Sequence, residues 1–173
     1  ALDKLAKMLN LGYPGGPIVA KLAMRHPDPA PKAGEGYPTN VGNEVPHSRE
    51  IPLRQLANRN DIIKFPRPML NTKDYDFSFS GLKTAALYFI KTLSPTQIKK
   101  LTPAICAEFQ QAIVDVLTKK TIRAAKEFGV KTIMLAGGVA ANNLLRETLK
   151  LETYNLKLNF SVPQKKFCTD NAA

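Results

Sequence analysis

Apolar residues near the start of the chain recur at spacings of three and four, which is the pattern of one buried helix face. Within 1–9 this face is formed by Leu2, Leu5, Ala6 and Leu9. Gly12 ends this helix, and a second short helix begins at Pro17, because proline suits the first helical position. The sequence therefore predicts two short helices joined by a turn.

Two further apolar stripes predict helices in the middle of the chain. One follows Gly81, with apolar residues at Leu82, Ala85, Ala86 and Phe89. The other begins at Thr102-Pro103, where a hydroxyl can cap the helix and proline fits the first turn, and it ends at Gly129. Its stripe is formed by Ile105, Phe109, Ile113, Val116 and Leu117. We expect this long helix to be a scaffold of the core.

Three stretches have the pattern of strands. Residues 132–135 form a short, continuous apolar run, which predicts a buried strand, and residues 156–162 alternate between apolar and polar. Residues 76–80 also alternate and predict a half-buried strand. A helical pattern separates the first two, so a right-handed crossover would make them parallel. The pattern as a whole predicts an α/β protein.

Residues 26–47 have almost no periodic apolar pattern and carry five prolines and three glycines. This composition predicts an irregular surface loop. The loop holds the two histidines of the chain, His26 and His47, each beside a proline. Nothing in their spacing makes them converge on a metal ion, so we expect ordinary loop residues.

The composition suits one domain with a moderate core, since 44% of the 173 residues are hydrophobic and 23% are charged. The net charge of +11 would attract a polyanion such as RNA. Basic residues gather in 51–69 and near the end of the long helix, where we expect an outer basic surface of Lys119, Lys120, Arg123 and Lys126. The alternatives for these side chains are simple solvation or a favourable interaction with the helix C-terminus.

The two cysteines, Cys106 and Cys168, lack CxxC spacing and indicate reduced thiols rather than a disulfide framework. No apolar run reaches the about 18 residues of a membrane span, and no signal-like stretch opens the chain. We therefore expect a cytoplasmic protein with no membrane partner.

Two glycine turns mark candidate ligand sites. Gly137 and Gly138 follow the apolar run and would bring a phosphate or a nucleotide sugar close to the amides of the next helix. The stretch Tyr13–Pro17 holds a second glycine pair. A plain strand-to-helix turn and a plain helix-helix connection are the alternatives. Asp170 follows the second strand, and the topology places it on the same side of the sheet as Gly137.

Six blocks of sequence resemble the TsaD family of tRNA threonylcarbamoyladenosine transferases. They are ALDKLAK at 1–7, LGYPGGP at 11–17, FPRPM at 65–69, DFSFSGLKT at 76–84, LAGGVAAN at 135–142 and CTDNAA at 168–173. Six blocks in the order of the family are far more specific than any one of them, and DFSFSGLKT resembles the bacterial or organellar members.

The resemblance implies an α/β fold that is part of the actin-like, sugar-kinase-like ATPase (ASKHA) architecture, mainly its second lobe. It also implies that residues 1–173 are a fragment that lacks the N-terminal lobe. In keeping with this expectation, Ala1 opens the chain without a methionine and directly within a helical pattern.

The intact family enzyme transfers a threonylcarbamoyl group from threonylcarbamoyl-AMP to N6 of the adenosine 3′ of the tRNA anticodon. The resemblance thus implies an acyltransferase of tRNA modification, with tRNA and threonylcarbamoyl-AMP as substrates. A paralogous TsaB-like subunit and a TsaE-like ATPase are the implied protein partners. We expect the fragment to be inactive alone.

The resemblance also implies roles for single residues. Asp3 would contact the ribose of the substrate nucleotide, Gly16 would pack bare backbone against that nucleotide, and Asn142 would contact it. Without the resemblance, Asp3 is a solvated acid in a first helical turn and Asn142 a polar residue at a helix start. Asp170 would bind one divalent metal ion, iron with zinc or magnesium as alternatives. The metal-binding His-x-x-x-His of the family is absent from this chain.

Other functions stay open. An ATP-dependent small-molecule kinase of the same architecture would use the Gly137-Gly138 turn for ATP, although the FPRPM and CTDNAA blocks argue against it. A metallopeptidase would need His-Glu-x-x-His, which the chain lacks. In a non-catalytic role the basic surface would only dock tRNA or a partner. Lys83, at the start of a helix, would meet a phosphate or tRNA, or would simply be solvated.

Overall fold

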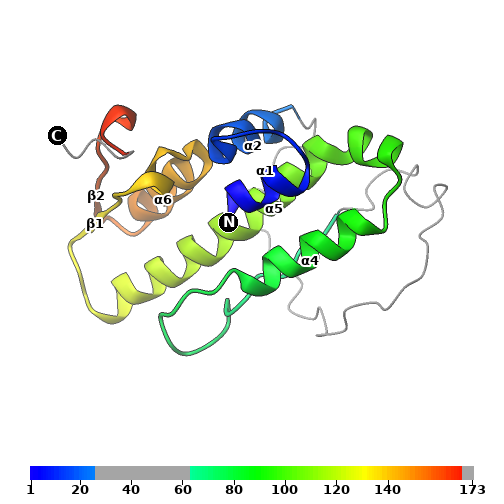
Figure 1. Cartoon of the computed structure of the whole chain (residues 1–173). Helices are drawn as coiled ribbons and strands as arrows, with labels where there is room; N and C mark the ends of the chain where they lie inside the picture. Colours follow the sequence, from blue (N-terminus) through cyan, green and yellow to red (C-terminus); the bar gives the residue numbers. More distant parts are fainter. Residues whose placement is uncertain (26–62, 169–173) are drawn as a thin grey trace. The chain divides into compact units, whose positions relative to one another are not determined.

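The computed structural model describes residues 1–25 and 63–168, which form two compact units. Unit 1 comprises residues 1–25, 63–66 and 80–109, and unit 2 comprises residues 67–79 and 110–168. Figure 1 shows the helices and strands along the chain. The predictions made for 26–47 and for Asp170 lie outside the described residues.

Unit 1 is helical. It contains α1 (Leu2–Met8), α2 (Gly15–Ala23), α4 (Ser80–Lys91) and the first part of α5 (Pro95–Glu127), and α1 packs against both α2 and α4. The predicted helices at the start of the chain and after Gly81 are confirmed. The second helix begins two residues earlier than predicted, at Gly15 rather than Pro17.

The core of unit 1 is made by the apolar stripes read from the sequence. Its fully buried side chains include Leu5, Val19, Leu82, Ile105 and Phe109. An aromatic group supports them, because Phe65 meets the rings of Phe89 and Phe109 edge-on, with centroids 5.8 Å and 6.0 Å apart.

The long helix α5 begins at Pro95, so the predicted start at Thr102-Pro103 was wrong. The start signal is a capping box: Ser94 Oγ accepts from the Gln97 amide at 3.3 Å, and Gln97 Oε1 accepts from the Ser94 amide at 2.7 Å. Pro95 then occupies the first helical position. The Thr102 hydroxyl instead donates to the Ile98 carbonyl within the helix, at 2.7 Å.

Unit 2 pairs two strands with the rest of α5. The strands β1 (Thr132–Met134) and β2 (Asn159–Ser161) are parallel, with Ile133 opposite Phe160. Between them lie the 3-10 helix η1 (Gly138–Ala141) and helix α6 (Asn143–Asn155), and the short η2 (Lys165–Phe167) follows β2. The predicted parallel strand-helix-strand arrangement and its α/β class are confirmed for this helix-rich chain.

Two apolar clusters form the core of unit 2. Val114, Leu145 and Leu149 pack between α5 and α6, while Ile122, Ala125 and Ile133 pack between α5 and β1. The predicted burial of the whole 132–135 run was wrong, because Ile133 is buried but Met134 is 78% exposed. A strand with one neighbour and one covered face buries only alternate side chains.

The predicted strand at 76–80 is not present. Residues 76–79 have no regular structure, Phe77 is 48% exposed, and Ser80 already belongs to α4. A strand needs a neighbour for its backbone groups, whereas here the carbonyls of Asp74 and Asp76 accept from Lys120 Nζ at 3.2 Å and 2.6 Å. A lysine side chain thus takes the place of a neighbouring strand.

Lys120 was expected on the outer surface of α5, and this was wrong. Its side chain is 1% exposed, and it also donates to Thr72 Oγ1 at 2.8 Å and to Asp74 Oδ1 at 2.9 Å. Arg123 donates to carbonyls of the loop before α4, residues 72–79, at 2.6 Å in the case of Thr72. The loop needs these donors because its own backbone carbonyls have no helix or strand partner.

These contacts shift the pKa values of two residues of this loop, Asp74 and Tyr75. The hydrogen bond from Lys120 lowers the pKa of the Asp74 carboxyl. A hydrogen bond from the Tyr75 hydroxyl to Glu127 raises the pKa of Tyr75, and the Arg123 guanidinium lies over its ring, 5.1 Å from the centroid.

None of the helices in 1–25 and 63–168 is both long and apolar enough to cross a membrane.

Candidate functional site

The glycine turn of unit 1 is fixed by Asp3. Its Oδ1 accepts from the Gly15 amide at 2.7 Å, which ties the start of α1 to the start of α2. A Cβ at Gly15 would lie 2.6 Å from Ala6 Cβ and 2.7 Å from Asp3 Cα, so no larger residue fits. Gly15 therefore makes the close approach of the two helices possible.

Gly16, the residue singled out from the sequence, is open instead. A Cβ built on it would meet no atom of the described chain within 4 Å, and the preceding Tyr13 is 87% exposed. As far as residues 1–25 and 63–168 are concerned, the space in front of Gly16 is thus open for a ligand to lie against the backbone. Sequence reasoning missed Gly15, although the Gly-Gly pair was the signal that could have found it.

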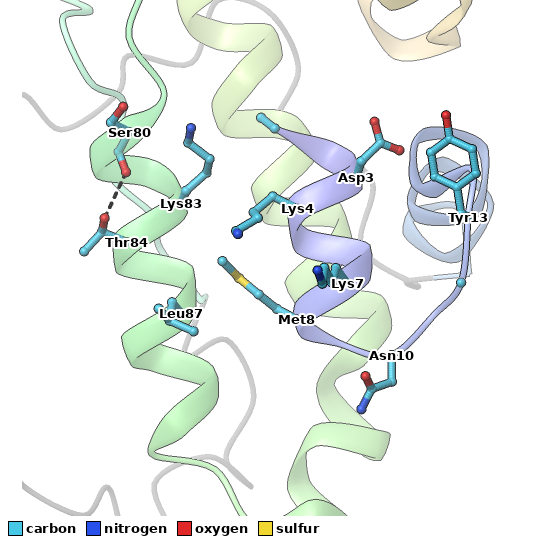
Figure 2. A pocket seen from close by; sticks show the side chains of 12 residues that line it. Asp3, Lys4, Lys7, Met8, Asn10, Tyr13, Ser80, Lys83, Thr84 and Leu87 are labelled. Carbon is cyan, nitrogen blue, oxygen red and sulfur yellow. Dashed lines mark hydrogen bonds between the residues drawn. The ribbon is translucent and has the colours of Figure 1, made fainter.

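Unit 1 also carries an open depression of about 1130 Å³ along α1 and the start of α4. Figure 2 shows Lys4 and Met8 extending from α1 toward α4, with Asp3 and Tyr13 at the far rim. The depression is lined by Ala1, Asp3, Lys4, Lys7, Met8, Asn10, Gly12, Tyr13, Ser80, Lys83, Thr84 and Leu87. Asp3 therefore stands both at the glycine turn and at the edge of this depression.

The glycine turn of unit 2 follows β1. Gly137 has φ +80° and ψ 178°, a conformation that is essentially restricted to glycine. Both Gly137 and Gly138 are exposed, and a Cβ on Gly137 would meet no described atom within 4 Å. The first amides of η1 have no acceptor within their helix, so the exposed turn can present them to an anion.

Asn142 caps α6. Its Oδ1 accepts from the Leu145 amide at 3.1 Å, while its Nδ2 donates to Gln110 Oε1 at 3.0 Å. The side chain therefore has a structural role at the helix start. One hydrogen of the amide nitrogen remains for a further acceptor, so the predicted nucleotide contact stays a prediction.

Arg146 joins the turn to the segment that leads toward Asp170. It donates to the Ala140 carbonyl in η1, to the Pro163 carbonyl at 2.7 Å and to Cys168 Sγ at 3.1 Å. The Cys168 carbonyl lies 3.9 Å from the position of a Cβ on Gly138. Residue 168, two positions before Asp170, is thus held beside the turn. Sequence reasoning missed Arg146, and no local pattern pointed to it.

The described residues hold no metal centre: no three His, Cys, Asp or Glu side chains in 1–25 and 63–168 lie close enough to bind an ion. Asp170 lies outside them. Both cysteines are buried and form no disulfide, and burial raises the pKa of the Cys106 thiol to about 12. Burial therefore favours the neutral thiol form of Cys106 at neutral pH.

Comparison with known families identifies the chain. Residues 39–173 match the family model of TsaD, described as tRNA N6-adenosine threonylcarbamoyltransferase. The chain belongs to the TsaD family. The match includes the glycine turn of unit 2, helix α6 and the segment that contains Asp170.

Curated relatives extend the TsaD match to the start of the chain. The chain is 40% identical to the tRNA N6-adenosine threonylcarbamoyltransferase of Thermosipho africanus and 41% identical to that of Desulfotalea psychrophila. The corresponding protein of Ralstonia pickettii is 40% identical. Each alignment covers 100% of this chain, and the chain spans 42% of the length of each relative.

Proposed function

We propose that the protein takes part in tRNA modification as an acyltransferase, moving a threonylcarbamoyl group from threonylcarbamoyl-AMP to N6 of the adenosine 3′ of the anticodon. The observation that carries this proposal is the TsaD match over residues 39–173. The relatives that bear this enzyme name are more than twice as long as the chain. The activity is therefore proposed for the full-length protein, and these residues alone are expected to be inactive.

In this proposal each unit offers the nucleotide part of the substrate an open glycine turn, and each turn is described within its own unit. Gly16 offers bare backbone, and Gly137 and Gly138 offer exposed backbone beside the first amides of η1. Asp3 uses one carboxylate oxygen to hold the Gly15 amide. The other oxygen is then available to accept from a ribose hydroxyl, because a carboxylate has more than one acceptor site.

Asn142 would support the glycine turn of its own unit, unit 2. The hydrogen bonds of its side-chain amide to Leu145 and Gln110 tie the start of α6 to α5, and its remaining N–H would contact the nucleotide. Since these bonds fix the side chain before a ligand arrives, little rotamer entropy is lost on binding.

We further propose that Asp170 supplies one oxygen ligand to a divalent metal ion, iron with zinc or magnesium as alternatives. When bound, such an ion would orient the mixed anhydride and stabilise negative charge that develops during acyl transfer. What supports this role is the position of the preceding segment. Arg146 holds Cys168, which is two residues before Asp170 in the sequence, near Gly138.

The larger setting is also a proposal. The α/β arrangement is compatible with the second lobe of an ASKHA-type ATPase fold, and the family membership supports it. A paralogous TsaB-like subunit and a TsaE-like ATPase are the proposed partners, and the cytoplasm is the proposed compartment.

The test is threonylcarbamoyl transfer to unmodified tRNA by the full-length protein, with bound metal quantified in the same samples. Asp170→Ala should lose both metal and transfer. Glu147→Ala is the matched control, since it removes an exposed carboxylate from α6 and should keep both. An Asp170→Ala protein that retains metal and transfer would remove this residue from the site, and an inactive wild type that phosphorylates a small acceptor with ATP would favour a kinase.

A further inference from the structure

Three lysines face the open depression of unit 1. Lys4 and Lys7 lie on α1 and Lys83 lies in the first turn of α4, and all three line the depression. Within 1–25 and 63–168 none of them has a carboxylate partner. Asp3, the acid at the rim, already accepts from the Gly15 amide. The depression therefore presents three positive charges that the described part of the protein does not neutralise.

The shape of the depression suits an extended ligand. At about 1130 Å³ and open to solvent, it is larger than the pockets that enclose small molecules. Met8 and Leu87 add apolar side chains to its lining, while Tyr13, also in the lining, is 87% exposed. In Figure 2 the lysines come from both helices, so a chain of phosphates running between them would meet charge on both sides.

We propose that this lysine-lined depression binds the phosphodiester backbone of RNA, which in the proposed function is the tRNA substrate. Ammonium groups neutralise phosphates without reading sequence, and an exposed tyrosine ring gives an unpaired base a stacking surface. The net charge of +11 would attract the polyanion to the chain as a whole. This inference rests on the proposed function, because that function names the RNA.

The other source of a phosphate is the nucleotide substrate. Asp3 borders the depression and is also the proposed ribose contact. The lysines could therefore bind the phosphate of threonylcarbamoyl-AMP instead of RNA. The two sources differ in their salt dependence. Each lysine–phosphate contact with a polyanion releases counterions, so removing such contacts makes the binding affinity less dependent on salt. A mononucleotide has few counterions to release, so its affinity depends little on salt.

The experiment uses the full-length protein with Lys4, Lys7 and Lys83 all changed to Gln. The matched control changes Lys91, Lys99 and Lys100 to Gln, which removes the same charge from exposed positions of unit 1 outside the depression. Binding of unmodified tRNA is measured over a range of KCl concentrations, and AMP binding is measured by calorimetry. Circular dichroism checks that each variant is folded.

We expect the slope of log Kd against log salt to fall by about 2–3 in the depression variant, about one per lost contact, with AMP affinity unchanged. The control should keep a slope close to that of the wild type. An unchanged slope in the depression variant overturns the inference, and so does weaker AMP binding with an unchanged tRNA slope.

The wild type separates this inference from the proposed function. A wild type that transfers threonylcarbamoyl while the depression variant keeps its slope overturns the inference alone. Lysine-dependent tRNA binding without transfer by the wild type supports the inference and contradicts the proposed function. A wild type that neither binds tRNA nor transfers overturns both.

Discussion

The two units hold their loops in different ways. In unit 1 the turn before α2 is fixed by close packing at Gly15 and by one carboxylate, and the nearby lysines Lys4 and Lys83 face an open depression. In unit 2 positively charged side chains hold the loops in place. Lys120 is buried against the loop before α4, and Arg146 ties η1 to the segment after β2. Similar lysines and glycine pairs therefore have different physical roles in the two units.

This difference shows what a glycine or a lysine contributes once its surroundings are known. Gly15 is needed because neighbouring atoms leave no room for a Cβ, whereas Gly137 is needed because its backbone adopts φ +80°. A lysine without a described carboxylate partner is available to a ligand, but one with four acceptors is part of the fold. The following substitutions test that contrast.

The largest effect is expected from Gly15→Ala. The new methyl would lie 2.6 Å from Ala6 Cβ and 2.7 Å from Asp3 Cα, so α1 and α2 must move apart. We expect a loss of about 3 kcal/mol in the free energy of unfolding, the upper end for overpacking. Gly16→Ala is the control and should leave stability nearly unchanged in thermal and denaturant unfolding. Equal losses in the two variants would show that packing at Gly15 is not the reason for its glycine.

Lys120→Met should come next, with a loss of about 2 kcal/mol. The substitution keeps most of the side-chain volume but removes the donor for the carbonyls of Asp74 and Asp76. Lys119→Met is the matched control on the same helix, because exposed Lys119 makes one side-chain hydrogen bond within the described part of the chain, to Asn71. Chemical denaturation measures both. If the two variants lose the same stability, burial of Lys120 does not hold the loop.

A loss of about 1–2 kcal/mol is expected for Gly137→Ala, since alanine strongly disfavours φ +80° with ψ 178°. The neighbouring Gly138→Ala should be tolerated, because its Cβ would lie at an ordinary 3.9 Å from the Cys168 carbonyl. Thermal unfolding compares the two variants, and transfer activity then reports whether either methyl blocks the proposed nucleotide site. A Gly137→Ala protein with wild-type stability would contradict the conformational explanation.

The smallest effect concerns pH. The pKa of Asp74 is held below its usual value of 3.8, mainly by the hydrogen bond from Lys120. A carboxyl whose folded pKa is lowered adds stability above its unfolded pKa and loses that stability as the pH falls through its folded pKa. The stability difference between wild type and Lys120→Met should therefore narrow in acid below pH 3.8. Unfolding curves from neutral to acidic pH measure it, and a constant difference would contradict the role given to this pair.

Much of the fold could be predicted from local patterns. The apolar stripes gave the helices around α1, α4 and α6, and the crossover argument gave the parallel pairing of β1 with β2. The start of α5 could also have been found, because Ser94, Pro95 and Gln97 form a readable capping box. Thr102-Pro103 carries the same kind of signal, a hydroxyl residue followed by proline, so local pattern alone does not decide between the two starts.

The candidate site was predictable in part. The sequence pointed to both glycine turns, and the structure places the segment before Asp170 beside Gly138. The sequence did not distinguish Gly15 from Gly16, because the two glycines differ only in which atoms of the folded chain lie in front of them. Nor did the sequence indicate Arg146, whose acceptors lie in two segments, η1 and the residues that follow β2.

The sequence by itself determined the family, the helical stripes and the α/β class, because periodicity and ordered blocks are properties of the chain alone. The tertiary structure decided that residues 76–79 form no strand and that Lys120 lies inside. The acceptors of Lys120 lie 44 to 48 residues away along the chain. Folding alone brings them close enough to replace water around a buried ammonium group.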